Sequence, residues 1–495
     1  MLNLLRDEQE RRRAKNRKKK VLCPYCHQHF LLGEVAFRSG EEASVFSESR
    51  LSYEEETFRN AWEARGWITA GEETVTDEHT VVEKPRYMCE DRNAKRYYEV
   101  SEEREGGPQR VADVRFRIVD ENRMEEPVYD EDGYLIGCVE QIGGKSVRTE
   151  ERMCPHCFCL LPNDYGKYPA KFVSILGVAG SGKTNYIAQL LGDRSVFAAM
   201  HIDVVVGADG ARFEELYAPR DLGDADKVRK KLNERGQAKG NAQSTANILF
   251  ADSTTTEKSY PPVFLTLYRQ GDAENRITLV LCDVAGENCA NQAAIQTRGE
   301  FILHSDGIIL LISPEQVAHA MRDEISFAEE DGIQCQSKLT LERVFSTIHA
   351  FAMERRVLKR LWRVPMALTL SKFDCYQRAT LSNGCTLSEE LFDNLQYERA
   401  IFHADAQRQR DGMLNRIGVF NADTLRTPLE QYKRKKRFAI AVIGKDAETG
   451  STVRSLRLEE PFAWFLSHWG WIPAEGESAS FIRSFWMRLM SHFRG

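Results

Sequence analysis

One eight-residue segment constrains the fold of this 495-residue chain more than any other. It reads Gly-Val-Ala-Gly-Ser-Gly-Lys-Thr from Gly177 to Thr184 and fits the pattern G-x-x-x-x-G-K-[ST] without departure. An apolar stretch typical of a buried strand precedes it at residues 171–177, and an apolar stretch typical of a helix follows at residues 185–191. A strand that runs through a glycine loop into a helix predicts an α/β domain.

The same segment predicts a site for the phosphates and Mg²⁺ of a nucleoside triphosphate. Glycines let backbone N–H groups turn inward around phosphate oxygens, and the helix N-terminus adds a favourable dipole. Lys183 is expected to reach the β- and γ-phosphates, and the Thr184 hydroxyl to ligate Mg²⁺. The expected nucleotide contacts in this segment are Gly177, Ala179, Gly180, Ser181, Gly182, Lys183, Thr184 and Asn185.

A second motif, Asp283-Val-Ala-Gly286, follows the apolar stretch 276–283. A carboxylate at the end of that strand can hold Mg²⁺ through water, and the Gly286 N–H can bond a γ-phosphate and release it after hydrolysis. Glu287 comes next and could orient the attacking water, but its charge repels the γ-phosphate, so we expect hydrolysis to be slow or to need a partner. The expected catalytic residues are Lys183, Asp283, Gly286 and Glu287.

The third motif is Ser371-Lys372-Phe373-Asp374, at the end of the strand-like stretch 366–374. A carboxylate can accept two hydrogen bonds from the N–H groups at the edge of guanine, and adenine offers no such pair. The stem of Lys372 can cover the base plane. Ser371, Lys372 and Asp374 are therefore expected to bind the base; the alternative is that Asp374 is a plain helix cap and the nucleotide is ATP.

These three motifs together resemble those of P-loop GTPases of the Ras-like and translation-factor class, over about residues 171–470. The resemblance implies GTP as the nucleotide and a doubly wound domain with one antiparallel strand. The segments 263–270 and 276–283, separated by Gly-Asp-Ala-Glu-Asn, fit the hairpin of that class. Ser371 departs from the usual Asn or Thr of the base motif, which implies weaker base binding. The Mg²⁺-binding threonine of the first switch is left open among Thr245, Thr254, Thr255 and Thr256.

Two Cys-Pro-x-Cys pairs lie far apart, at Cys23/Cys26 and Cys154/Cys157. Each places two thiolates on a tight turn, so the two pairs can build one tetrahedral Zn²⁺ site. A redox pair is the rival interpretation, but no βαβ pattern surrounds either motif. We therefore predict a small zinc-ribbon-like module with a β-rich insert at residues 21–170, helical near residues 54–66. The fallback ligands are His27, His29, His156 and Cys159.

The cysteine pairs, Asp-Val-Ala-Gly-Glu at 283–287, Ser371–Asp374 and the closing Leu-Glu-Glu-Pro-Phe-Ala-Trp-Phe-Leu at 458–466 also resemble a bacterial group, the double-GTPase-like proteins of conflict and defence gene clusters. That resemblance implies a regulatory role with protein partners encoded nearby. The alternatives that remain are a P-loop ATPase of another class and a non-catalytic scaffold that binds nucleotide as a structural ligand.

The two ends of the chain carry different signals. Residues 1–20 form a basic tail, in which a solvated helix is the simplest interpretation and contact with nucleic acid, acidic protein or anionic lipid the alternative. Residues 471–495 have apolar side chains near helical spacing and predict an amphipathic helix. A net charge of −6 argues against a wholly basic nucleic-acid-binding protein. Without an apolar run long enough for a membrane span or a secretory signal, we expect a cytoplasmic protein.

Overall fold

The structure is a computed structural model, and it divides the chain into two compact units. Unit 1 comprises Met1–Ala170 and Glu257–Pro262, and unit 2 comprises Lys171–Thr256 and Val263–Gly495. The structure describes residues 2–39, 68–71, 84–87, 117–119, 124, 126–142, 145–178, 180–192, 195–206, 262–283, 295, 299–321, 324–328, 333, 341–382, 387, 391–393, 400–417, 423–442, 444–445, 452–453 and 455–475.

In the described residues, unit 1 begins with an α-helix, which is followed by short antiparallel strands. The paired sets are β1-β2, β10-β3-β6, β7-β8-β9 and β4-β5. The helix predicted near residues 54–66 lies outside the described residues. The elements are α1 (Leu2–Arg17), β1 (Lys20–Leu22), β2 (His29–Leu31), the 3-10 helix η1 (Leu32–Glu34), β3 (Ala36–Ser39), β4 (Ile68–Gly71), β5 (Lys84–Tyr87), β6 (Arg117–Val119), β7 (Glu126–Tyr129), β8 (Leu135–Ile142), β9 (Lys145–Thr149) and β10 (Arg152–Met153).

Unit 2 is a mixed α/β structure built on one seven-stranded sheet, which confirms the predicted α/β class. The sheet strands are β11 (Ala170–Leu176), β12 (Ile202–Val206), β13 (Val263–Arg269), β14 (Asp272–Asp283), β15 (Gly307–Ile312), β17 (Met366–Leu370) and β19 (Lys435–Ala439). The helices are α4 (Lys183–Gly192), α5 (Ser195–Ala198), η4 (Glu300–His304), α10 (Pro314–Ala320), α11 (Leu341–Glu354), α12 (Leu358–Leu361), η6 (Phe373–Arg378), α13 (Ala404–Arg416), α14 (Asp423–Glu430) and α15 (Glu460–His468). Unit 2 also contains two small antiparallel strand pairs: β16 (Ile325–Ser326) with β18 (Thr380–Leu381), and β20 (Gly444–Lys445) with β21 (Thr452–Val453).

The strand order of the large sheet is β12-β13-β14-β11-β15-β17-β19. β11, β15, β17 and β19 are mutually parallel, whereas β13 runs antiparallel to both β12 and β14. After β11 the chain builds the β12–β14 side of the sheet and then crosses to the other side at β15. β11 is therefore the point at which the strand order reverses, and ligands of open α/β sheets bind beyond the carboxyl ends of the strands at such a point.

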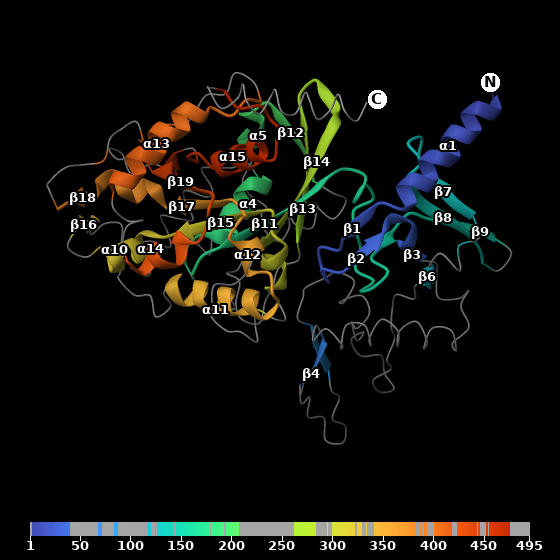
Figure 1. The fold of residues 1–495 in the computed structure, drawn as a ribbon, viewed down its shortest axis with the longest axis horizontal. Coiled ribbons are helices and arrows are strands. Elements are labelled where there is room, and N and C mark those ends of the chain that lie inside the picture. Colours follow the sequence, from blue (N-terminus) through green and yellow to red (C-terminus); the bar gives the residue numbers. More distant parts are fainter. Residues whose placement is uncertain are drawn as a thin grey trace, which may run out of the picture. The chain divides into compact units, whose positions relative to one another are not determined.

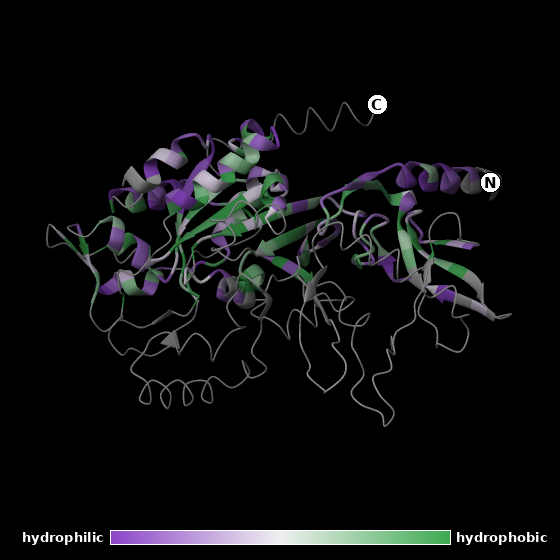
Figure 2. Cartoon of the chain, turned by 90° about the horizontal axis from the view of Figure 1, so that it is seen from below, coloured by the Kyte–Doolittle hydropathy of each residue, from purple (hydrophilic) through white to green (hydrophobic). Residues whose placement is uncertain are grey.

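Apolar side chains explain why the sheet is central. Every residue of β15 and β17 is buried, as expected for parallel strands covered on both faces. Helices α13 and α15 lie on one side of the sheet and α11 and α14 on the other (Figure 1), and the hydrophobic colouring concentrates on the strands between them (Figure 2). The ring of Phe465 in α15 packs against β15 at Gly307, where an added Cβ would lie 3.0 Å from the ring.

Two details of the sheet differ from the sequence-based expectation. The segment expected to be a five-residue loop between β13 and β14 is mostly strand, because β14 already begins at Asp272 and Arg269 pairs with it. Only Gln270 and Gly271 form the turn, and Gly271 has φ of +83°, which glycine adopts without steric cost. The edge strand β12 was not predicted, although its sequence Ile-Asp-Val-Val-Val is rich in β-branched residues.

The end of the described chain is irregular. Trp471 and Ile472 are buried beyond α15, and residues 476–495, which carry most of the predicted amphipathic helix, lie outside the described residues. Within the described parts of the chain, no helix combines the length and the apolar character that crossing a membrane requires.

Candidate functional site

The glycine-rich loop lies at the carboxyl end of β11 and leads directly into α4. β11 is buried from Phe172 to Leu176, so the strand holds the start of the loop rigidly. The Ser181 N–H donates to the Val178 carbonyl at 3.2 Å, and the Tyr186 N–H donates to the Gly182 carbonyl at 2.9 Å. The predicted sequence of strand, loop and helix is thus present, at the reversal point of the sheet.

Glycines in this loop serve two different physical needs. An added Cβ at Gly177 would lie 2.4 Å from Ser181 Oγ and 2.8 Å from the Leu311 carbonyl oxygen of β15, so close packing excludes a side chain there. Gly180 and Gly182 have φ of +78° and +86°, and an added Cβ at either would meet no atom of the described residues within 4 Å. At these two positions the backbone conformation is the requirement, and the described part of the chain leaves the space beside them open. A backbone exposed on that side fits a bound phosphate group.

Lys183 folds back over its own loop. Its Nζ donates to the carbonyl oxygens of Gly177 at 2.9 Å and of Val178 at 3.0 Å, and the residue is 5% exposed. Ser181 Oγ is also buried and finds no hydrogen-bond partner among the described residues. Buried polar groups normally have a hydrogen-bond partner, so the Ser181 hydroxyl marks this loop as a candidate site for a polar ligand.

The loop after β17 lies between the carboxyl ends of β15 and β19. The Ser371 N–H donates to Ile312 of β15 at 2.9 Å, and the Phe373 N–H donates to Ile440 after β19 at 3.0 Å. The Ser371 hydroxyl also donates to the Ile312 carbonyl at 3.4 Å. The serine therefore joins the ends of two strands, and this loop lies at the same edge of the parallel strands as the glycine-rich loop.

Lys372 pairs with a residue that sequence reasoning missed. Its Nζ lies 2.6 Å from Glu315 Oε1 in α10, and Lys372 itself has φ of +50°. Burial alone would raise the pKa of Glu315, but the neighbouring Lys372 ammonium and hydrogen bonds outweigh it, so the pKa lies below its usual value. The sequence signal was Ser-Pro-Glu directly after the strand that became β15, where an acidic residue in the first turn of a helix is favourable.

Asp374 lies inside the first turn of η6, whereas the residue at the N-cap of that helix is Lys372. A carboxylate in the first turn of a helix is favourable there, so this position fits both base binding and the alternative of a helix-stabilising aspartate. Asn185 is half-buried in α4. Ala179, Gly286, Glu287 and the candidate switch threonines lie outside the described residues. For Thr184 in α4 and Asp283 at the end of β14, only the backbone is described.

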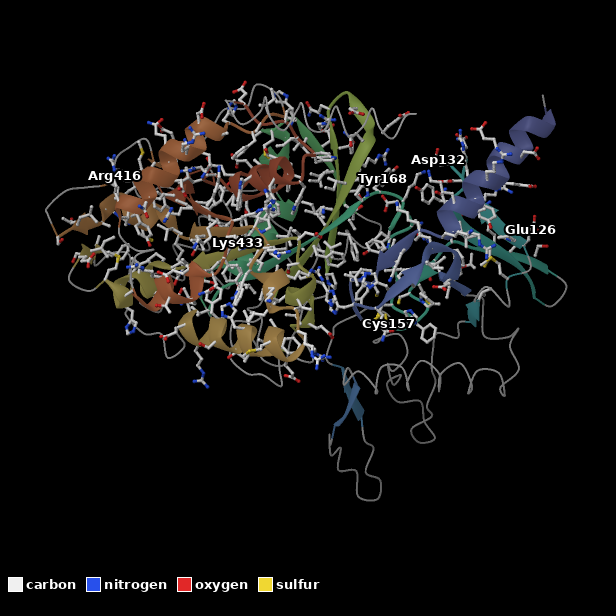
Figure 3. The ribbon with its side chains drawn as sticks, in the orientation of Figure 1. Glu126, Asp132, Cys157, Tyr168, Arg416 and Lys433 are labelled. Atoms are coloured by element: carbon white, nitrogen blue, oxygen red, sulfur yellow. The ribbon has the colours of Figure 1, made fainter. Side chains whose placement is uncertain are left out.

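In unit 1, the four predicted cysteines come together. Cys23, Cys26, Cys154 and Cys157 have Sγ atoms that all lie within 4.8 Å of one another, and His27, His29, His156 and Cys159 are not part of this group. Three of the four are buried and Cys26 is half-buried. Figure 3 shows sulfur atoms beside the labelled Cys157.

The two cysteine turns have the same local structure. Each lies at the tip of a short antiparallel pair, with Leu22 opposite His29 in one and Met153 opposite Leu160 in the other. In each turn a backbone N–H donates to the first sulfur at 3.4 Å, and the residue after the second cysteine, His27 or Phe158, has φ near +55°. Two equivalent turns presenting thiols to each other are the arrangement of a closed metal site.

Strand pairing explains how cysteines so distant in sequence meet. β10, which leads into the second turn, pairs antiparallel with β3, which follows the first turn closely. Cys23 Sγ lies 3.7 Å from Cys157 Sγ, and Cys26 Sγ lies 3.8 Å from Cys154 Sγ. Thiolates bound tetrahedrally at about 2.3 Å from one Zn²⁺ are about 3.8 Å apart, so the cluster fits this ion.

The surroundings of the cluster shift the pKa values of its thiols in opposite directions. Burial, more than any other influence, raises the pKa of Cys23 and of Cys157 well above the usual value for a thiol. Hydrogen bonds from Cys154, Cys157 and Cys23 instead lower the pKa of Cys26 strongly. Metal binding needs all four as thiolates, so it must release protons from the buried thiols.

Comparisons with known proteins add little to this geometry. No protein-family model and no curated protein matches the sequence. Among solved structures, the chain is similar to the signal recognition particle receptor SRb-GTP/SRX complex from Chaetomium thermophilum, with 13% identity over 57% of this chain and 94% of that chain and a TM-score of 0.23. The SRb-GDP structure from the same organism has 10% identity, covers 61% of this chain and 99% of that chain, and has a TM-score of 0.20. Scores this low do not support an argument about fold or function.

Proposed function

We propose that this protein is a GTP-binding and GTP-hydrolysing switch whose N-terminal unit is held together by a structural zinc ion. The observation that carries the nucleotide part is the loop Gly177–Thr184 at the carboxyl end of β11, with Lys183 folded over it and open space beside Gly180 and Gly182. Its position at the reversal point of the sheet is where an α/β domain binds ligands.

In this proposal the backbone N–H groups of the loop and Lys183 bind the triphosphate, and Thr184 and Asp283 hold Mg²⁺, which neutralises charge on the phosphates when bound. Gly286 reports the presence of the γ-phosphate, and Glu287 orients the attacking water. The repulsion between Glu287 and the γ-phosphate favours slow turnover or activation by a protein partner. A regulatory role in a bacterial defence or conflict system rests on the sequence resemblance alone.

Base selection is assigned to the loop after β17. Asp374 accepts two hydrogen bonds from guanine, and Lys372 lies along the base plane with its ammonium paired to Glu315. The bonds from Ser371 and Phe373 to the ends of β15 and β19 support this assignment, because they hold the loop at the nucleotide edge of the sheet. A loop anchored at both sides loses little entropy when it binds a base.

The zinc part of the proposal rests on the Sγ distances and on the paired turns. A four-cysteine site without a water ligand is structural, so the ion stabilises unit 1 and does no chemistry. Elemental analysis of the purified full chain is expected to give one zinc per molecule.

Replacing one charge tests the phosphate assignment. Lys183→Ala is expected to abolish binding of a fluorescent GTP analogue while the thermal unfolding of the chain stays close to that of the wild type, because the residue acts as a point charge on phosphate. Lys433→Ala, at an exposed position of unit 2, is the matched control and is expected to bind normally. Retained nucleotide affinity in a folded Lys183→Ala protein contradicts the assignment.

A second substitution tests the base and separates the alternatives. Asp374→Asn is expected to weaken GTP binding and improve xanthosine triphosphate binding, because an amide offers a donor to the xanthine C2 oxygen. Equal ATP and GTP affinities in the wild type, unchanged by Asp374→Asn, would favour a P-loop ATPase. A wild type that binds GTP but releases no phosphate, alone or with proteins encoded by neighbouring genes, would favour the non-catalytic scaffold.

A further inference from the structure

Helix α1 is not a loose tail, because its backbone and side chains are anchored on unit 1. Asn16 Nδ2 donates to the Asp132 carbonyl at 2.9 Å, in the turn between β7 and β8, and Asp132 is labelled beside α1 in Figure 3. An added Cβ at Gly133 in the same turn would lie 3.1 Å from the Arg13 backbone nitrogen, and one at Gly33 would lie 3.2 Å from the Arg17 carbonyl oxygen. The helix therefore packs closely at two glycines.

The cations on the side of α1 that faces unit 1 make contacts within that unit. The Arg13 guanidinium lies 4.7 Å from the centre of the Tyr129 ring. Just beyond the helix, Lys19 Nζ donates to the Lys167 carbonyl at 2.9 Å and lies over the Tyr134 ring. These contacts hold the residues at 13, 16 and 19 toward the unit and fix which side of the helix faces solvent.

The opposite side carries three exposed cations in one stripe. Arg11, Lys15 and Lys18 follow helical spacing of four and three residues, so they lie above one another over about 10 Å. No described residue forms an ion pair or side-chain hydrogen bond with any of them, in contrast to Arg12, which pairs with Glu8 at 2.7 Å. The three cations are thus fixed in place without a partner within the described part of unit 1, and the same face carries the carboxylates of Asp7 and Glu8 one turn before Arg11.

We propose that this stripe binds the phosphate backbone of double-stranded DNA without sequence preference. Figure 2 shows α1 mostly in the hydrophilic colour. Its large apolar residues, Leu2, Leu4 and Leu5, are confined to the start of the helix, and the part from residue 7 onward, which carries the stripe, has none. A membrane-surface helix needs such side chains, and so does the core of a protein interface. Single-stranded nucleic acid is bound on exposed aromatic rings, which the stripe also lacks. Lysine and arginine side chains on one exposed face supply the point charges that neutralise phosphates of a duplex backbone.

The proposal predicts a specific salt dependence. Each cation that neutralises a phosphate releases a counterion, so three contacts contribute about 2.7 to the slope of log affinity against log salt, or about 40-fold between 50 and 200 mM salt. The net charge of the chain is −6, so this binding depends on the local stripe and not on the overall field.

The test measures fluorescence anisotropy of a labelled mixed-sequence 20-base-pair DNA with the full chain and with the variant Arg11→Gln, Lys15→Gln, Lys18→Gln. Glutamine keeps helix propensity, and unchanged circular dichroism and zinc content will show that unit 1 is intact. The matched control removes three exposed cations of unit 2: Lys359→Gln, Arg360→Gln, Arg363→Gln.

The wild type and the control are expected to bind DNA at 50 mM salt with the same salt dependence. In the stripe variant, the slope of log affinity against log salt is expected to be smaller in magnitude by about 2.7. Absence of wild-type binding at 50 mM salt overturns the proposal, as does an equal loss in the control. Binding to duplex RNA, single-stranded DNA or vesicles containing phosphatidylserine that equals or exceeds binding to duplex DNA also overturns it.

Discussion

Gly177 offers a sharp test of how the glycine-rich loop is packed. In Gly177→Ala the new methyl group would lie 2.4 Å from Ser181 Oγ and 2.8 Å from the Leu311 carbonyl oxygen. The serine side chain can rotate away, but the carbonyl belongs to the interior of β15, where Leu311 pairs with Thr369 of β17. The loop must therefore move away from the strand, at a cost of about 1–3 kcal/mol typical of overpacking.

Gly412 provides the matched comparison. It lies inside α13, and an added Cβ there meets nothing within 4 Å. Gly412→Ala should therefore stabilise unit 2 by about 0.5–1 kcal/mol, since alanine restricts the unfolded chain and favours a helix. The same substitution is thus expected to lower the free energy of unfolding at position 177 and to raise it at position 412.

Chemical denaturation of the full chain, followed by tryptophan fluorescence, measures both effects, and titration with a fluorescent GTP analogue measures the loop. Gly177→Ala is also expected to lower nucleotide affinity, because the Gly177 and Val178 carbonyls that hold Lys183 would move. If Gly177→Ala proves neutral or stabilising, as Gly412→Ala should be, the loop is not packed against β15.

Three further predictions concern other parts of the chain. Cys154→Ser should lose the zinc and destabilise unit 1 while nucleotide binding persists, whereas the control Cys375→Ser should keep the metal. Elemental analysis measures the zinc and titration with GTP measures nucleotide binding. A full zinc content in Cys154→Ser contradicts the site. A double-mutant cycle with Glu315→Gln and Lys372→Met should give a coupling of about 0.5–1 kcal/mol in unfolding, because both side chains are about one-third exposed; no coupling would refute the pair. Burial, then the Glu460 carboxylate, raises the pKa of Glu459 to about 7 from 4.5. Its contribution to the unfolding free energy should therefore fall by roughly 3 kcal/mol as the pH rises from 4.5 to 7, and a difference between wild type and Glu459→Gln that does not change with pH would argue against this.

Local sequence was sufficient wherever a short segment carries its own structural requirement. The apolar runs that became β11, β15 and β17 are buried almost completely, so their strands could be predicted without knowledge of their neighbours. The turns at Cys23–Cys26 and Cys154–Cys157 could also be predicted, because proline and two cysteines at this spacing specify a tight turn with two thiols on one side.

Other features depend on contacts between distant segments. The edge strand β12 becomes a strand by pairing with β13, more than fifty residues later in the chain, and its short sequence alone did not predict this. The length of the β13–β14 hairpin was decided by register and by the positive φ of Gly271. Strand register is a property of the pair, so neither strand contains the information by itself.

The same division applies to the candidate sites. The sequence identified Lys372 and the four cysteines as chemically competent residues. Only the tertiary structure decided that Glu315 pairs with Lys372, and that β3 and β10 bring the two cysteine turns within bonding distance of one ion. It also decided which side of α1 is exposed, since that depends on the turn at Gly133. Residue type sets the chemistry that a side chain can perform, whereas packing between distant elements sets which partners it meets.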